Sequence, residues 1–179
     1  MKIPAYISHY GLRAKNLKES VDWYTTVFNA KIQHQNEFLV FMTFDDEHHR
    51  LVIFEDPETV DKPPTAAGID HVGFGVAGFG ELVATYERLK AEGITPFLPL
   101  NHKFTTSLYY RDPDGNEVEL SVDNFPKQEC HAFITSERMN EIGHPPFGCE
   151  FDAEELARQY HAGVPDDVLA RIGIPNESA

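Results

Sequence analysis

The chain has 179 residues and a formal charge of −14, because 29 acidic residues outweigh 15 basic ones. This length suits one domain with a full core, or two small modules, but not two large domains. The negative charge disfavours nucleic acid and anionic membrane surfaces as partners, since both would repel the chain. Two cysteines occur, and the sequence has no signal-like start and no long apolar run, so we expect a reduced, cytoplasmic protein.

The first half of the chain reads as one strand, one helix and three further strands. The first strand is expected over Tyr6 to Leu12, where it carries His9. Asn16 is expected to cap the helix with Glu19 as the second member of a capping box, and Asn29 is expected to end it. The three strands that follow are expected over Ala30 to His34, Phe38 to Phe44 and Leu51 to Phe54.

This pattern returns after residues 56–68, a linker rich in proline. His9 and Gly11 recur as His71 and Gly73. Two helix residues recur at the same spacing, Val21 and Tyr24 as Val83 and Tyr86. Such a repeat is a supersecondary unit used twice. Burying one helix face and one sheet face in each unit predicts an α+β fold, in which two tandem βαβββ modules form a curved mixed sheet around a shared cavity, with the helices outside.

The expected domain covers residues 1–123, with module one at about 5–57 and module two at about 67–123. The last hairpin of module two turns at Asp112–Asn116, where proline and glycine favour a tight turn. Glu119 then falls between apolar residues of a strand, facing either solvent or a group that compensates its charge.

Together, these modules resemble the vicinal oxygen chelate superfamily, with a histidine on the first strand of each module and a glutamate on the last strand of the second. Within it, the pattern is similar to the small type I extradiol ring-cleaving dioxygenases. Their signature is a histidine, five to seven residues, an aliphatic-tyrosine pair, a proline turn and a metal-binding glutamate. Here it reads His102, Leu108-Tyr109, Pro113 and Glu119.

The resemblance implies an enzyme that opens a catechol, such as a biphenyl-2,3-diol, with O2. The implied cofactor is Fe(II), with Mn(II) as the other metal that histidine and carboxylate ligands accept. The implied metal ligands are His9, His71 and Glu119. Standing alone, each histidine could equally be a hydrogen-bonded core residue, and the glutamate could be solvated.

The resemblance also implies three catalytic residues, His49, His102 and Tyr109. His49 matches a histidine that takes and returns a substrate proton. The alternative is that His49 and its neighbour His48 belong to an exposed polar loop. His102 and Tyr109 match residues that hydrogen-bond the substrate, although a strand tyrosine is also ordinary core material.

Aligning the two final hairpins through their turns places Val52 opposite Glu119. Glyoxalase-like members of the superfamily generally use four protein ligands, and valine cannot bind a metal. Three ligands therefore favour a metal that accepts a bidentate substrate and oxygen. Glu55 has the wrong strand parity for a ligand, which predicts a solvated surface charge.

Residues 124–179 form a C-terminal extension in which short helices are expected at Ala153 to His161, behind the cap Asp152, and at Asp166 to Ile172. The first of these helices either packs over the sheet edge or between subunits, or covers the cavity mouth as a lid, and packing is expected. His131, His144 and His161 receive no role. Two alternative functions remain open: another metal-dependent enzyme of the superfamily (epimerase, isomerase or lyase), and a non-enzymatic binding module. A homo-oligomer is expected.

Overall fold

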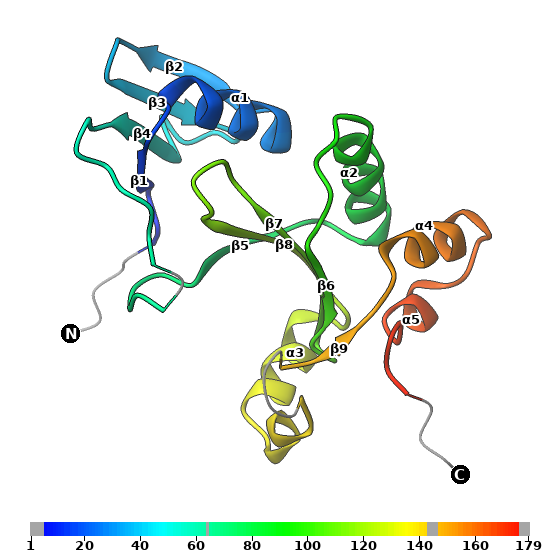
Figure 1. The fold of residues 1–179 in the computed structure, drawn as a ribbon. Coiled ribbons are helices and arrows are strands. Elements are labelled where there is room, and N and C mark those ends of the chain that lie inside the picture. The colour runs from blue at the N-terminus through cyan, green and yellow to red at the C-terminus, as the bar shows by residue number, and fades with distance from the viewer. Residues whose placement is uncertain (1–5, 64, 143–146, 176–179) are drawn as a thin grey trace. The chain divides into compact units, whose positions relative to one another are not determined.

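The structure is a computed structural model that describes residues 6–63, 65–142 and 147–175. The chain divides into two compact units, the first made of residues 1–68 and 112–116 and the second of residues 69–111 and 117–179. Figure 1 labels their elements. Within the described ranges, no helix has the length and apolar character needed to cross a membrane. His144, to which the sequence assigned no role, lies outside these ranges.

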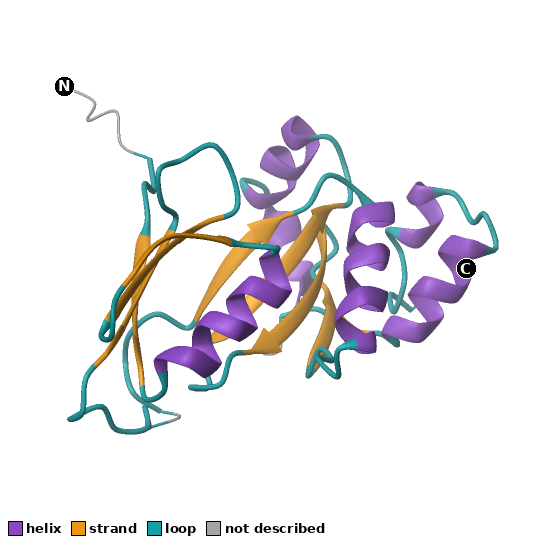
Figure 2. Ribbon diagram, turned by 90° about the horizontal axis from the view of Figure 1, so that it is seen from above, coloured by secondary structure: helices purple, strands orange, loops and turns teal. Residues whose placement is uncertain are grey.

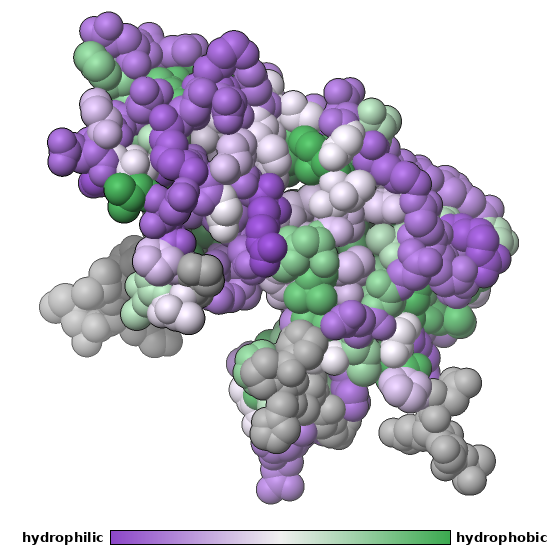
Figure 3. Space-filling view, viewed as in Figure 1, coloured by the Kyte–Doolittle hydropathy of each residue, from purple (hydrophilic) through white to green (hydrophobic). Residues whose placement is uncertain are grey.

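The first unit contains one helix and a four-stranded sheet. Its elements are β1 (Tyr10–Ala14), α1 (Leu17–Phe28), β2 (Lys31–Gln35), β3 (Leu39–Thr43) and β4 (Leu51–Glu55). The strand order is β1-β4-β3-β2, with β1 parallel to β4 and the other pairs antiparallel. α1 packs against β3 and β4 (Figure 1). In Figure 3 the visible surface of these elements is mostly hydrophilic, in keeping with the acidic composition.

Helix α1 begins and ends where the sequence predicts. The Asn16 side chain accepts a hydrogen bond from the Glu19 amide, and Asn29 closes the helix in the left-handed conformation at φ 50°. Glu55 is exposed, as expected for a solvated surface charge, and it also has a structural role. Its carboxylate accepts a 2.8 Å hydrogen bond from the Leu17 amide, so it satisfies a free donor and adds negative charge at the helix N-terminus.

The predicted first strand starts too early. β1 begins at Tyr10, whose amide donates to the Arg50 carbonyl, so His9 lies one residue before the strand. The preceding carbonyls of Ile7 and Ser8 accept hydrogen bonds from the Arg50 guanidinium. A side chain therefore replaces the neighbouring strand as their partner, and the alternation of the sequence could not reveal this.

The Asp112–Asn116 turn belongs to the first unit and is built around one buried carboxylate. Asp112 is 6% exposed and accepts hydrogen bonds from the amides of Asp114 and Asn116. It also accepts from the Tyr24 hydroxyl, at 3.1 Å. Gly115 adopts φ 81°, as the predicted turn requires. Burial raises the pKa of the Asp112 carboxyl although these donors oppose the shift.

The second unit repeats the arrangement and adds further elements. It contains β5 (His71–Gly75), α2 (Phe79–Ala91), β6 (Leu98–Asn101), β7 (Thr105–Arg111), β8 (Glu117–Asp123), α3 (Lys127–Ile134), a 3-10 helix (Glu137–Ile142), β9 (Cys149–Glu150), α4 (Ala153–His161) and α5 (Asp166–Leu169). The five strands pair in the order β5-β8-β7-β6-β9. Figure 2 distinguishes these strands from the helices by colour.

The α+β fold of two βαβββ modules is confirmed, with each module forming its own hydrogen-bonded sheet, of four and five strands, in place of one continuous sheet. The register confirms the internal alignment as well. Gly11 lies opposite Val52 in the β1–β4 pair, and Gly73 lies opposite Glu119 in the β5–β8 pair. Val52 is therefore the structural counterpart of Glu119.

The C-terminal extension packs on the second unit. The predicted helices are present, although α5 stops at Leu169, three residues earlier than expected. α4 packs beside α2, where the Glu154 carboxylate accepts from the Tyr86 hydroxyl at 2.7 Å and pairs with Lys90. α3 and β9 were not predicted, and β9 extends the sheet beyond β6.

The buried Tyr24–Asp112 hydrogen bond gives a stability prediction. Tyr24→Phe removes one donor from a buried carboxyl, and we expect it to lower the free energy of unfolding by about 1–3 kcal/mol. Tyr86→Phe is the matched control in the second module, because Tyr86 donates to Glu154, which is 55% exposed. Urea unfolding should show a clearly smaller loss for Tyr86→Phe. Equal losses would mean that Asp112 does not depend on Tyr24.

Candidate metal and catalytic site

Glu119 lies at the centre of the candidate site in the second unit. It stands in the middle of β8, opposite Gly73 on β5 and opposite Tyr109 on β7. Its side chain is 12% exposed. A Cβ added at Gly73 would lie 2.8 Å from Glu119 Oε2. The missing side chain at position 73 therefore makes the space that the carboxylate occupies.

His71 presents one ring nitrogen to this carboxylate. Its Nε2 lies 3.3 Å from Glu119 Oε2, and its Nδ1 lies 2.9 Å from the carboxylate of the preceding residue, Asp70. A carboxylate on one imidazole nitrogen fixes the ring and raises the basicity of the other nitrogen, which is how metal-binding histidines are usually held. His71 Nε2 and a Glu119 oxygen thus form a pair of atoms that could coordinate one metal ion.

His102 and Tyr109 complete the cluster. His102 Nε2 lies 3.0 Å from the Tyr109 hydroxyl and 3.9 Å from Glu119 Oε1. The Tyr109 ring meets the His71 ring edge-on, with centroids 5.3 Å apart. Burial, followed by the negative charge of Glu119, raises the pKa of Tyr109 well above its ordinary value. Tyr109 is therefore a hydrogen-bond donor at neutral pH. Its neighbour Tyr110 points to the other face and is fully buried.

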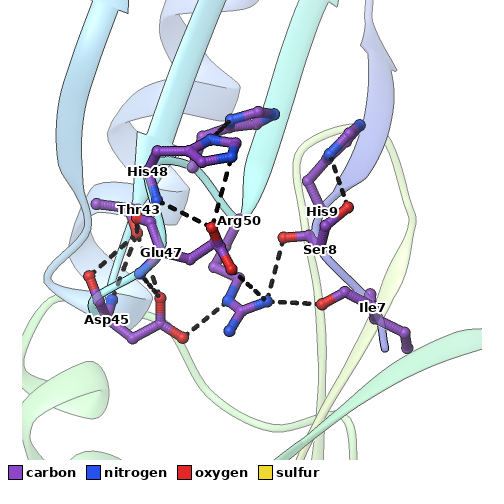
Figure 4. A network of polar contacts seen from close by, with 9 residues as sticks. Ile7, Ser8, His9, Thr43, Asp45, Glu47, His48 and Arg50 are labelled. Carbon is purple, nitrogen blue, oxygen red and sulfur yellow. Dashed lines mark hydrogen bonds and ion pairs between the residues drawn. The ribbon is translucent and has the colours of Figure 1, made fainter. Parts of the chain in front are cut away.

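In the first unit, His9 is held by a network around Arg50 (Figure 4). The guanidinium donates to the carbonyls of Ile7 and Ser8, at 2.6 and 3.1 Å, and to the Asp45 carboxylate at 2.8 Å. Ser8 Oγ in turn lies 3.3 Å from His9 Nδ1. As with Asp70 and His71, the residue before the histidine contacts Nδ1, which leaves Nε2 as the nitrogen that could coordinate a metal ion.

The structure distinguishes His49 from His48. The His48 side chain is 71% exposed. The His49 ring is half-buried, with its centroid 5.0 Å from that of Phe41 and 4.5 Å from that of His9. Partial burial, followed by the neighbouring imidazoles of His48 and His9, lowers the pKa of His49. Both histidines lie in the loop between β3 and β4, and His49 is the less exposed of the two.

The predicted site residues therefore fall into two groups. The second unit brings together His71, Glu119, His102 and Tyr109, and the first unit brings together His9 and His49. Within the described part of either unit, no three histidine, cysteine or carboxylate side chains are gathered around a common metal position. The three-ligand set of His9, His71 and Glu119 stays a prediction.

The donors present suit a divalent metal such as iron. Glu119 is a partly buried carboxylate, and among the described residues it pairs with no lysine or arginine, only with the imidazoles of His71 and His102. A carboxylate in this setting needs a compensating positive charge. Imidazole nitrogen and carboxylate oxygen are the donors of non-haem iron sites that keep coordination positions open.

Sequence reasoning missed three residues that shape these groups: Arg50, Asp70 and Gly73. Asp70 precedes its histidine directly, as Ser8 precedes His9, so the repeat itself could have indicated a supporting role. Arg50 directly follows His48 and His49, but it belongs to no sequence motif that would indicate its role. The need for glycine at position 73 follows only from the register, which brings the Glu119 carboxylate against it.

A pocket of 880 Å³ in the second unit lies elsewhere. It is bordered by the ends of β5 and β8 and the start of α3, and its lining includes Glu81, Asp123 and Lys127. None of the four clustered side chains lines it, so we assign it no part in the site.

Comparison with known proteins identifies the family. Residues 6–120 match the model of the Glyoxalase/Bleomycin resistance protein/Dioxygenase superfamily. This range covers both modules. The chain belongs to this superfamily, also called the vicinal oxygen chelate superfamily, as its sequence motifs indicate.

Two curated relatives come from Rhodococcus globerulus. Biphenyl-2,3-diol 1,2-dioxygenase 2 is 39% identical over 162 residues, which is 89% of this chain and 84% of the relative. Biphenyl-2,3-diol 1,2-dioxygenase 3 is 36% identical over 172 residues, which is 94% of this chain and 89% of the relative. The similarity thus runs along nearly the whole chain.

Solved structures show the same fold. The lactoylglutathione lyase from Agrobacterium tumefaciens matches with a TM-score of 0.55 and 25% identity, over 68% of this chain and 96% of that one. A glyoxalase/dioxygenase from Nostoc punctiforme matches with a TM-score of 0.58 and 15% identity, over 69% of this chain and 96% of that one. They confirm the architecture.

The contact between Gly73 and Glu119 gives a prediction about metal affinity. In Gly73→Ala the new methyl group would displace the flexible carboxylate end, because the clash is with a side chain and not with the backbone. We expect Fe(II) affinity to fall about tenfold or more while the thermal midpoint changes little. Titration with Fe(II) under anaerobic conditions measures the affinity.

Gly11→Ala is the matched control, since Gly11 has the same register in the first module and open space where its Cβ would be. It should bind Fe(II) as the unaltered protein does. If both variants bind equally well, the position of the Glu119 carboxylate does not depend on Gly73.

Proposed function

We propose that the chain is an Fe(II)-dependent extradiol dioxygenase that opens a catechol of the biphenyl-2,3-diol type with O2. The observation that carries this proposal is the cluster of His71, Glu119, His102 and Tyr109 in the second unit. It joins two donors of the metal-binding type to a histidine and a tyrosine that can hydrogen-bond a substrate oxygen. The similarity to two biphenyl-2,3-diol dioxygenases supports the substrate class.

His71 and Glu119 of the second unit and His9 of the first would hold the ion. When bound, ferrous iron supplies the electron transfer that allows dioxygen to react with a catechol. In each histidine, Nδ1 is already engaged by the preceding residue, so Nε2 is the nitrogen left to bind the ion.

The first unit supports a set of three ligands over a set of four. Phe41 lies opposite Val52 there, as Tyr109 lies opposite Glu119 in the second unit. At these paired strand positions the first unit has two apolar side chains, whereas the second has the phenol of Tyr109 and the carboxylate of Glu119. This difference favours the dioxygenase over the lyase or epimerase alternatives.

The remaining residues act by moving or holding protons. His49, with its lowered pKa, is neutral near pH 7 and can take a hydroxyl proton from the catechol and later return it. Tyr109 keeps its proton and donates a hydrogen bond to negative charge that develops on a substrate oxygen. His102 orients Tyr109 through their 3.0 Å contact.

Cytoplasmic location and self-association stay predictions from the sequence.

Anaerobic loading with Fe(II), followed by a panel of catechols in aerated buffer, tests the activity. We expect a yellow ring-opened product from biphenyl-2,3-diol, with O2 consumed in equal amount. Glu119→Gln should lose iron and activity together, because an amide supplies no negative charge to the ion. Stoichiometric iron without product from any catechol would favour another metal-dependent reaction of the superfamily, and full iron occupancy in Glu119→Gln would refute the ligand assignment.

A second variant separates proton transfer from binding. His49→Phe keeps an aromatic ring against Phe41 and His9 but cannot carry a proton, so we expect kcat to fall about 10²-fold or more with iron content unchanged. His48→Phe is the control, since that side chain is mostly exposed, and it should retain activity. Stopped-flow measurement of product formation compares the two. Equal turnover would assign His49 to the loop alone.

A further inference from the structure

The segment that follows the undescribed residues 143–146 reaches back to the site. The carbonyl oxygen of Phe147 lies 2.7 Å from His102 Nδ1. β9 begins two residues later and pairs with β6, with Cys149 opposite Asn101. Asn101, which precedes His102, is thus paired with Cys149, and the ring of His102 is hydrogen-bonded to Phe147.

This contact determines which nitrogen of the His102 ring carries hydrogen. A carbonyl oxygen only accepts hydrogen bonds, so Nδ1 must be the donor. In the neutral ring Nε2 is then an acceptor that faces the Tyr109 hydroxyl at 3.0 Å. This hydroxyl also hydrogen-bonds the Glu119 carboxylate, so in the metal-free protein its single hydrogen is shared between Nε2 and the carboxylate, and it turns to a substrate oxygen only when substrate is bound. The other tautomer would set the lone pair of Nδ1 against the carbonyl oxygen and leave a poorly solvated acceptor unsatisfied. His102 is 14% exposed, so water offers little compensation.

The side chain of Asn101, the residue before His102, holds the chain around His102 in place. It is fully buried, and its amide nitrogen donates to the carbonyls of Ala170 and Ile172, at 3.1 and 2.9 Å. Its amide oxygen accepts from the Lys103 main chain at 2.8 Å. The Asn101 side chain therefore connects Lys103, the residue after His102, to residues 170 and 172 of the C-terminal extension.

The approach of this segment is too close for an ordinary residue. A Cβ at Gly148 would lie 2.5 Å from the Asn101 carbonyl oxygen, which is main chain and cannot swing aside. Phe147 adopts φ 58°, a left-handed conformation that is uncommon for a bulky residue. Strained main chain of this kind is kept where the surrounding structure requires it.

The extension is also shared with relatives. The family model ends at residue 120, whereas the alignment with biphenyl-2,3-diol 1,2-dioxygenase 3 covers 94% of this chain and so includes most of residues 124–179. The extension therefore accompanies the modules in a relative with that activity.

We propose that the C-terminal extension is a positioning element of the site, in which the Phe147 carbonyl holds His102 as its Nδ1–H tautomer so that Nε2 faces Tyr109 as an acceptor. Phe147 acts through His102 and touches no reacting atom. The inference rests on the proposed function for its effect on turnover, but the tautomer itself is a property of the metal-free protein.

The tautomer is measurable directly. Long-range 1H–15N spectra of the metal-free protein, labelled with 15N-histidine and assigned with His102→Gln, should show protonated Nδ1 and unprotonated Nε2 at His102 when the ring is neutral. A protonated Nε2 in the neutral ring would overturn the proposal whatever the enzyme does.

Gly148→Ala tests the role in catalysis. The methyl group should push β9 away from β6 and withdraw the Phe147 carbonyl, so that His102 shows a mixture of tautomers. We expect kcat to fall about tenfold or more at unchanged iron content, as is usual when a supporting hydrogen bond is lost. Gly75→Ala is the control in the same unit, because its added Cβ meets nothing within 4 Å.

The outcomes separate the alternatives. If the extension only packs, Gly148→Ala lowers the thermal midpoint but leaves the tautomer and the kcat of the folded enzyme unchanged, which overturns the proposal. If no catechol is cleaved by any variant while the spectra show the Nδ1–H form, the proposed function fails and the positioning of His102 stands.

Discussion

The candidate site depends on the close approach of the Glu119 carboxylate to the main chain at Gly73. This approach follows from the parallel pairing of β5 with β8, which sets the two residues opposite each other, and from the absence of a side chain at position 73. Once the carboxylate lies there, His71 and His102 face its two oxygens, and its charge acts on Tyr109. One register therefore fixes the distances among four functional groups.

Duplication supplied the scaffold twice, and the chemistry then diverged on it. The first module keeps the glycine at position 11 and a polar contact on Nδ1 of His9, but Val52 and Phe41 occupy the row that holds Glu119 and Tyr109 in the second. Because strand pairing constrains the backbone and not the type of side chain, the sheets accept a carboxylate at this position in one module and an apolar residue in the other.

The sequence predicts those features whose causes are local or repeated. The caps Asn16 and Asn29, the Asp112 turn and the equivalence of Val52 and Glu119 follow from short patterns or from the repeat, and the structure contains them all. The start of β1 and the two-residue strand β9 could not be predicted. Their partners, the Arg50 guanidinium and β6, are tertiary contacts, and neither segment has a periodicity long enough to read.

The C-terminal extension illustrates why packing and function need not be alternatives. A short edge strand such as β9 protects β6 from pairing with another chain, which is reason enough for it to exist. Yet the same strand anchors the Phe147 carbonyl, two residues before it, beside His102, and its pairing with Asn101 restricts where that carbonyl points. A main-chain oxygen can favour one tautomer only if it is rigidly held. A mobile carbonyl would move away from an unprotonated Nδ1 at little cost, so both tautomers would be populated. The packing interaction thus supplies the precision that the catalytic group requires.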